Sequence, residues 1–239
     1  IETPSNPMME ITDLSACAEL AKEHNLLMIT DNTFLSPYLQ NPIALGADIV
    51  IHSASKFLCG HNDTIAGFVC SAKEELAAKI RLIAKTTGGC LSPFDSWLVM
   101  RGIKTLAVRM ERQQENAGNI ARWLTEQKKV RKVYYAGLET HPGYEINAKQ
   151  ARGAGAMISF DVDSVETAQR VLEKVRVITF AESLGGTESL ITYPMKQTHP
   201  DVPKEWREKL GITDTLLRLS VGLEHVDELI ADLEQAFVS

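Results

Sequence analysis

Hydrophobic positions in the first third of the chain show two kinds of spacing. Residues 12–24 carry apolar side chains on one face behind a capping Thr12 or Asp13, which predicts a helix. Continuous apolar runs at 26–31, 48–53 and 65–71 are typical of buried strands. This alternation predicts an α/β fold in which helices sandwich a mainly parallel sheet.

Helical spacing dominates the middle of the chain. It covers residues 74–85 and then runs from Ile103 to Leu124, which predicts one long helix there. A helix of that length can bridge two domains. We therefore expect a first domain over residues 1–105 and a smaller C-terminal α+β domain over 106–239.

The second predicted domain contains hydrophobic spacing typical of helices and spacing typical of strands. We expect a helix at 164–175, a loop with a short helix at 194–214, and strands near 155–162, 177–180, 188–193 and 215–221. A final helix is indicated by an apolar stripe formed by Val226, Leu229, Ile230, Leu233 and Phe237.

Composition narrows the class of protein. The chain has 239 residues, 44% of them hydrophobic and 23% charged, which excludes a disordered chain. A net charge of −6 without basic blocks argues against a nucleic-acid surface. No membrane-spanning run, signal peptide or C-x-x-C pair is present, so we expect a cytoplasmic protein. Because the chain opens on Ile1, we also expect that a natural N-terminal portion is missing.

The densest chemical pattern follows the run 48–53. Ser53 and Ser55 flank Lys56 just beyond this predicted strand, where open α/β sheets bind ligands. Hydroxyls bond phosphate well, and a lysine among them is a counter-charge or a nucleophile. The alternative is a surface lysine in a polar loop.

Asp31 ends the preceding predicted strand and should share that sheet edge with Lys56. A carboxylate at the end of an apolar strand is costly unless it meets a cation. Pyridoxal 5′-phosphate (PLP) needs this set: a lysine for the Schiff base, hydroxyls for phosphate and an acid at the pyridinium nitrogen. The alternative for Asp31 is a turn cap beside Asn32 and Thr33.

Six segments together resemble the PLP-dependent Cys/Met metabolism family, which includes cystathionine β-lyase, γ-lyase and γ-synthase and methionine γ-lyase. They are ETPSNP (2–7), ITDNTF (29–34), ADIVIHSASKFLCGHND (47–63), LSPFDSWLVMRGIKTLAVRME (91–111), AESLGGTESLITYP (181–194) and LLRLSVGLE (216–224). The resemblance implies the aspartate-aminotransferase-like fold type I, with 1–105 as the C-terminal part of the large PLP-binding domain. It also implies a homotetramer, a dimer of dimers with shared active sites.

The resemblance assigns cofactor roles to five residues. Lys56 would form the Schiff base and then carry protons, while Asp31 would pair with the pyridinium nitrogen. Ser53 and Ser55 would bind the phosphate; many relatives have Thr at the position of Ser55. Asn6 would lie near the cofactor's 3′-oxygen and the substrate carboxylate, with a simple Asn-Pro turn as the alternative.

Substrate binding falls to two further residues. Arg218 would take the substrate's α-carboxylate, because its planar fork bonds a carboxylate through two parallel N–H groups. Burying an arginine within an apolar strand also costs free energy unless the charge has a partner. Ser183 would help hold that carboxylate, and the glycines after it would admit close backbone approach or form a turn.

The resemblance lacks the family segments that precede residues 2–7. In the family a glycine-rich phosphate loop, a ring-stacking aromatic residue, and a tyrosine and arginine from the neighbouring subunit precede the ETPSNP segment. None can be matched here. We expect a molecule of these residues alone to lack part of its cofactor clamp and to be poorly active.

Other patterns are weaker. His52 and His61 flank the lysine without spacing for a metal site, and the sequence RGAGA at 152–156 lacks a full dinucleotide fingerprint. The remaining candidates are cysteines expected to be small buried residues: Cys59, Cys70 and Cys90.

The expected activity is a PLP-dependent carbon–sulfur lyase that cleaves cystathionine by β-elimination. The segment 181–194, followed by QTH at 197–199, resembles bacterial cystathionine-handling enzymes most. Cystathionine γ-synthase and γ-lyase are the close alternatives, and methionine γ-lyase a weaker one. Two readings from other classes remain: a catalytically incompetent truncated scaffold and a Rossmann-type oxidoreductase.

Overall fold

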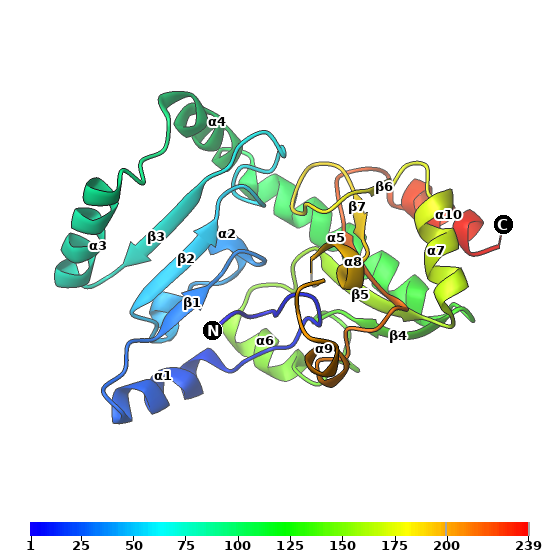
Figure 1. The fold of residues 1–239 in the computed structure, drawn as a ribbon, viewed down its shortest axis with the longest axis horizontal. Coiled ribbons are helices and arrows are strands. Elements are labelled where there is room, and N and C mark those ends of the chain that lie inside the picture. Colours follow the sequence, from blue (N-terminus) through cyan, green and yellow to red (C-terminus); the bar gives the residue numbers. More distant parts are fainter. Residues whose placement is uncertain (199, 239) are drawn as a thin grey trace.

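Two β-sheets and the long helix between them organise the molecule. The computed structural model describes residues 1–198 and 200–238. Figure 1 shows a three-stranded sheet on the left, a five-stranded sheet on the right, and helix α5 (Leu106–Thr125) running from one to the other. The strand orders are β1-β2-β3 and β4-β5-β8-β7-β6.

The three-stranded sheet contains β1 (Ile29–Asp31), β2 (Ile49–Ser53) and β3 (Gly67–Ser71). β1 and β2 are parallel, as the sequence predicts, whereas β3 runs antiparallel to β2. The apolar run at 65–71 is not a buried strand, because Val69 is 50% exposed. A continuous apolar run identifies a strand, but it does not tell whether another layer covers it.

Five helical segments surround this sheet. They are α1 (Leu14–Glu23), α2 (Ser36–Leu39), the 3-10 helix η1 (Pro42–Leu45), α3 (Glu74–Thr87) and α4 (Pro93–Ile103). Asp13 caps α1 by accepting a hydrogen bond from the Ala16 amide, and Ser92 caps α4 in the same way. The predicted long helix from Ile103 is wrong at its start: α4 ends there and α5 begins at Leu106, after a turn.

The second sheet contains β4 (Val130–Tyr134), β5 (Met157–Val162), β6 (Thr179–Phe180), β7 (Leu190–Thr192) and β8 (Leu216–Ser220). Of its described strand pairs, only β6 and β7 are parallel. The helices of this part are α6 (Tyr144–Gln150), α7 (Val165–Lys174), α8 (Pro194–Gln197), α9 (Lys204–Lys209) and α10 (Val226–Val238). The α+β character is confirmed, although β4 and α6 were not expected.

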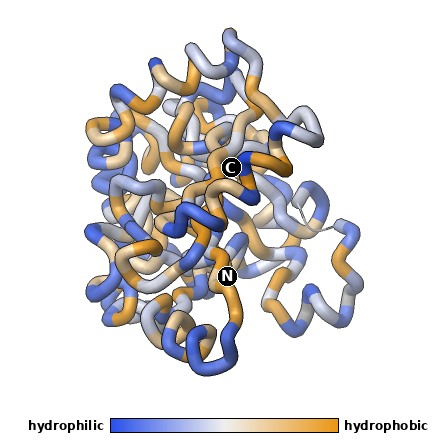
Figure 2. The backbone as a smooth tube through the Cα atoms, turned by 90° about the vertical axis from the view of Figure 1, so that its left-hand side faces the viewer, coloured by the Kyte–Doolittle hydropathy of each residue, from blue (hydrophilic) through white to orange (hydrophobic). Residues whose placement is uncertain are grey.

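One hydrophobic core passes through both parts of the chain. It contains Phe57 and Leu58 from the lysine turn, Ile120 from α5 and Phe160 from β5. The stripe on α10 enters it through Leu229, Leu233 and Phe237. Figure 2 shows hydrophobic and hydrophilic stretches alternating along the helices, as one-sided burial requires. The domain boundary near residue 105 stays a prediction.

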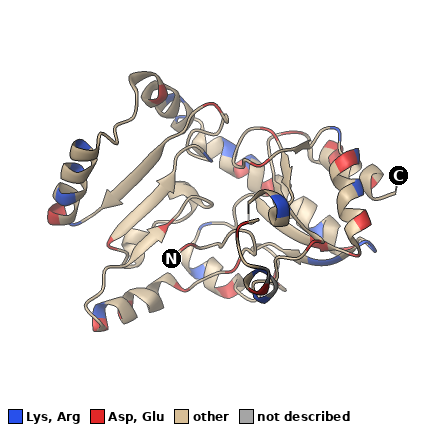
Figure 3. Cartoon of the chain, in the orientation of Figure 1, with Lys and Arg blue, Asp and Glu red and all other residues tan. Residues whose placement is uncertain are grey.

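Charge is spread over the surface rather than gathered into one face. Figure 3 shows acidic and basic residues intermingled on the helices of both parts. Within residues 1–198 and 200–238, no helix is long and apolar enough to cross a membrane.

Candidate active site

The turn after β2 places Lys56 at the carboxyl end of the three-stranded sheet. Two hydrogen bonds join the ends of β1 and β2: the Asn32 amide donates to the Ile51 carbonyl at 2.9 Å, and the Ser53 amide to Thr33 Oγ1 at 2.8 Å. The shared edge expected for Asp31 and Lys56 is therefore present in the structure.

Arg218 is buried in β8, with 1% of its surface exposed. Its Nη1 donates to Asn6 Oδ1 at 2.9 Å, and its Nη2 donates to the Glu182 carbonyl at 2.9 Å and to Thr192 Oγ1 at 3.2 Å. The third guanidinium nitrogen, Nε, is buried and has no hydrogen-bond partner among the described residues. Burial lowers the pKa of Arg218 to about 10, with Glu182 and Glu2 opposing the shift. A buried guanidinium with an unused donor is suited to an anionic ligand.

One cavity of about 320 Å³ brings predicted residues from distant parts of the chain together. Its lining residues are Asn6, Lys56, Glu182, Ser183, Leu184, Thr198 and Arg218. Four of the seven predicted site residues thus face the same space. Asn6 lies in a turn, as the alternative expected, and also accepts a hydrogen bond from Arg218.

The surroundings of Lys56 lower the pKa of its amine. Burial lowers the pKa of Lys56 below the ordinary lysine value, and the positive charge of Arg218 lowers it further, while Glu182 opposes both. An amine with a lowered pKa is a better nucleophile and proton acceptor near neutral pH than an ordinary lysine.

Asp31, Ser53 and Ser55 do not line this cavity. Asp31 Oδ1 accepts a hydrogen bond from the Thr33 amide at 2.9 Å, so the turn cap considered as its alternative exists. Ser55 Oγ accepts from the Ala66 amide at 2.9 Å and donates to the Ala66 carbonyl at 3.3 Å. Their cofactor roles stay predictions.

Asn62 is a site neighbour that the sequence did not single out. Its Nδ2 donates to Glu188 Oε1 at 2.6 Å, and its Oδ1 accepts from Ser183 Oγ at 3.2 Å. The loop after Lys56 is thereby joined to the segment that carries Ser183. The position of Asn62 within the matched segment 47–63 was the available signal, but the flanking histidines were more conspicuous.

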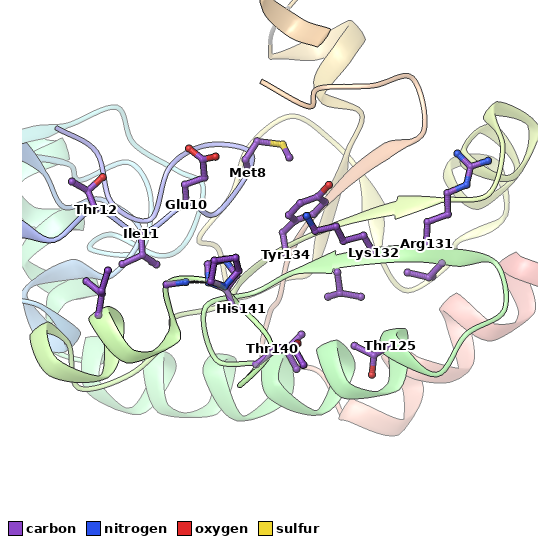
Figure 4. A pocket seen from close by; sticks show the side chains of 16 residues that line it. Met8, Glu10, Ile11, Thr12, Thr125, Arg131, Lys132, Tyr134, Thr140 and His141 are labelled. Carbon is purple, nitrogen blue, oxygen red and sulfur yellow. Dashed lines mark hydrogen bonds between the residues drawn. The ribbon is translucent and has the colours of Figure 1, made fainter. Parts of the chain in front are cut away.

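A second, larger cavity contains none of the predicted residues. It measures about 620 Å³ and lies between the segment 8–12, β4 and the residues around His141 (Figure 4). His141 Nδ1 accepts from the Gly143 amide at 3.0 Å, and the ring also bonds the Met9 backbone. Burial lowers the pKa of His141. The histidine therefore ties two segments together as a neutral ring.

The cysteine expectations need a correction. Cys59 is buried, but Cys70 and Cys90 are exposed, because β3 and the segment after α3 are not covered by other elements. The residues with described positions include no group of three or more His, Cys, Asp or Glu that could hold a metal ion. His199, the last residue of the QTH pattern, lies outside the described residues.

Similarity to proteins of known identity extends over the whole chain. Cystathionine β-lyase of Lactococcus lactis subsp. cremoris is 51% identical over 98% of this chain and 62% of its own length. Cystathionine γ-lyase of Bacillus subtilis is 49% identical over 99% of the chain and 62% of its length. Cystathionine γ-synthase of Haemophilus influenzae is 49% identical over 100% and 60%.

Solved structures show the same pattern. Cystathionine γ-lyase from Lactobacillus plantarum, complexed with L-serine, has a TM-score of 0.97 and 48% identity, covering 100% of this chain and 62% of the other. The chain thus spans about 62% of the length of these relatives. The model of the family described as Cys/Met metabolism PLP-dependent enzyme matches residues 1–238. The chain belongs to the family of PLP-dependent enzymes of cysteine and methionine metabolism.

Proposed function

We propose that the protein is a PLP-dependent carbon–sulfur lyase that cleaves cystathionine by β-elimination to homocysteine, pyruvate and ammonia. The observation that carries the proposal is the placement of Lys56 and Arg218 in one cavity. An amine with a lowered pKa and a buried guanidinium with an unused donor are what an amino-acid substrate needs at its Cα–H and its carboxylate.

The residues present fit PLP. Lys56 offers an amine of lowered pKa for the cofactor's aldehyde carbon. Asp31 offers a carboxylate for the pyridinium nitrogen, and Ser53 and Ser55 offer hydroxyls for the phosphate. Asn6, already fixed by Arg218, is available for the 3′-oxygen. PLP, when bound, supplies an electron sink for the charge that develops at the substrate's Cα.

The chain's own groups then perform three tasks. Arg218 binds the α-carboxylate, and Asn6 and Ser183 complete this contact from two sides of the cavity. Lys56 accepts the Cα proton, and its lowered pKa makes the neutral amine more available for this step than in an ordinary lysine. The protonated lysine next donates to the departing sulfur, so that homocysteine leaves as a thiol.

The γ-specific reactions are the second candidate. They need one more proton abstraction, at Cβ, which the same lysine can perform. The similarity to a γ-lyase and a γ-synthase at 49% identity each supports this candidate. Methionine γ-lyase has less support. A catalytically incompetent scaffold is disfavoured, because Asp31, Lys56 and Arg218 are all retained.

A homotetramer with shared active sites in the cytoplasm is the proposed assembly and location. Large apolar side chains stand exposed on α3, on α4 and at the start of α5, which supports an interface there. They are Leu82, Ile83, Phe94, Trp97, Met100 and Val108.

Product analysis tests the reaction. The purified protein, supplied with PLP, is given L-cystathionine, and the products are identified by mass spectrometry, with Lys56→Ala as the inactive control. Pyruvate with homocysteine supports β-elimination. 2-Oxobutyrate with cysteine contradicts it in favour of a γ-lyase. No product from the PLP-loaded full-length protein also contradicts it, and an assay of γ-replacement with an activated homoserine and cysteine follows.

A further inference from the structure

Arg109 on α5 is a buried arginine whose guanidinium points at the turn that carries Lys56. Only 3% of its surface is exposed. Nη1 donates to the Phe57 carbonyl at 2.8 Å, and Nη2 donates to the Leu58 carbonyl at 3.3 Å. These two carbonyls belong to the residues immediately after Lys56. The guanidinium therefore fixes the backbone immediately after Lys56.

The same guanidinium also holds the corner between α4 and α5. Nη2 donates to the Gly102 carbonyl at 3.0 Å, and Nε donates to Thr105 Oγ1 at 3.1 Å. Arg109 thus joins the lysine turn to a helix corner about fifty residues further along the chain. Such a link restricts the turn because the corner is anchored in two helices.

The partners of Arg109 are unusual for a buried cation. Its four hydrogen bonds to described residues end on three backbone carbonyls and one hydroxyl oxygen, and none of these acceptors is a carboxylate. Burial lowers the pKa of Arg109. Placing an unpaired cation in a protein interior costs free energy that an apolar side chain would avoid. The arginine is therefore better explained by the geometry that it imposes than by stability.

Two glycines show how closely the 56–60 turn packs against the Arg109 guanidinium and against the end of α4. A Cβ on Gly60, where φ is +76°, would lie 2.1 Å from Arg109 Nη1. A Cβ on Gly102 would lie 2.2 Å from the Cys59 carbonyl oxygen. The turn also closes on itself, because the Gly60 amide donates to the Lys56 carbonyl at 2.7 Å. No side chain separates the guanidinium from the turn.

We propose that Arg109 is a positioning residue that fixes the 56–60 turn and thereby aims the Lys56 amine into the cavity that contains Arg218. The proposal rests on the proposed function of Lys56. A proton acceptor must be held close to its working position, and small displacements lower the rate strongly. Arg109 does not line that cavity, so its effect on turnover passes through Lys56.

Three variants test this role. Arg109→Met keeps a long unbranched side chain and removes all donors. Arg109→Lys keeps the charge but has its three donors on one nitrogen, which cannot span the carbonyls that the arginine fork reaches. Arg112→Met is the matched control, because Arg112 is an exposed residue of the same helix, paired with Glu115. For each variant we would measure kcat, KM, the pH profile of kcat, and the pH dependence of Lys56 acylation in cofactor-free protein.

The expected result separates positioning from folding. Arg109→Met should lower kcat at least tenfold and move the Lys56 acylation profile, with KM within threefold of wild type because Arg218 still holds the carboxylate. Arg109→Lys should be intermediate, and Arg112→Met should match wild type. A folded Arg109→Met protein with wild-type kcat and an unchanged acylation profile would overturn the proposal, even if its thermal midpoint were lower.

A second variant keeps the test open if Arg109→Met does not fold. Gly60→Ala keeps Arg109 in the sequence but places a methyl group where its guanidinium lies, so the guanidinium must move away from the turn, and the same loss of kcat is expected. Wild-type turnover in Gly60→Ala and Arg109→Lys together would overturn the proposal. If the wild-type protein takes up PLP but cleaves no sulfur amino acid, the proposed function fails, and the acylation profiles alone decide the role of Arg109.

Discussion

At the scale of single residues, the chemistry depends on two cations that share one cavity. The pKa of Lys56 falls through burial and through the positive charge of Arg218. The arginine remains charged at neutral pH, because even its lowered pKa is about 10. The arginine can therefore bind a carboxylate as a cation, while the lowered pKa of Lys56 makes that lysine a better proton acceptor near neutral pH than an ordinary lysine.

Arg218→Ala should weaken substrate binding far more than it slows the chemical step. Removing one partner of a buried, hydrogen-bonded charge contact costs about 2 kcal/mol or more, which corresponds to roughly a 30-fold increase in KM. The measurement is steady-state kinetics with L-cystathionine. Arg176→Ala, at an exposed arginine of the same part of the molecule, is the control. A KM within twofold of wild type would assign the carboxylate to another group.

The pH dependence of Lys56 should respond to Glu182. Because the carboxylate of Glu182 raises the pKa of Lys56, the substitution Glu182→Gln should lower that pKa further. More of the lysine is then neutral at a given pH, and its acylation should begin at lower pH than in wild type. Glu166→Gln, at an exposed residue of α7, should leave the profile unchanged. The explanation fails if Lys56 in wild type titrates like an ordinary lysine.

At the scale of elements, a buried carboxylate on helix α10 binds the segment that leads into strand β6, in addition to the apolar packing of that helix. Asp232 is 5% exposed and accepts hydrogen bonds from the amides of Arg176, Val177 and Ile178. These amides precede β6, so the side chain holds the start of that strand against the helix. No sequence pattern indicated this contact, because an acid on a helix is usually on its solvated face.

Asp232→Ala should therefore destabilise the protein. Three amides lose a charged acceptor, and one or more of them stays buried, which costs about 3 kcal/mol in the free energy of unfolding. Urea denaturation measures the change. Glu234→Ala, at an exposed residue of the same helix, should stay within about 0.5 kcal/mol of wild type. Equal midpoints for the two variants would show that the amides find other acceptors.

The elements also show what the sequence can and cannot predict. The spacing of apolar residues located α1, α7 and α10 within two residues of their observed bounds, because each has one buried face and a clear start. β4 was missed because the adjacent charged residues Arg131 and Lys132 break the alternation of apolar and polar residues that identifies a strand. The break between α4 and α5 was missed because apolar residues keep helical spacing across the Lys104–Thr105 turn.

The site followed a similar rule. Lys56 was singled out because it follows an apolar strand, Asp31 because it ends one, and Arg218 because it interrupts one. Lys56 and Arg218 line the same cavity, whereas the cofactor role of Asp31 stays a prediction. Asn62 and Arg109 were not found, because both act on backbone or side-chain groups from segments far away in the sequence. Such contacts leave no local pattern.

At the scale of the whole molecule, helix α4 presents an exposed aromatic surface. Phe94 and Trp97 on α4 are 66% and 52% exposed, with ring centroids 6.1 Å apart, and Arg101 lies over the Trp97 ring at 5.9 Å. Aromatic residues and arginine are enriched where proteins meet one another. We therefore expect α4 to contribute to the proposed homotetramer.

Trp97→Glu should lower the oligomeric mass in solution, because a carboxylate placed in an apolar interface is left without a partner. Size-exclusion chromatography with light scattering measures the mass of the wild-type protein and of the Trp97→Glu variant. The matched control is Trp206→Glu on α9, a tryptophan that is 58% exposed in the other part of the molecule. An unchanged mass for Trp97→Glu would place the interface elsewhere. Loss of activity along with the mass would further indicate that the active site needs a neighbouring subunit.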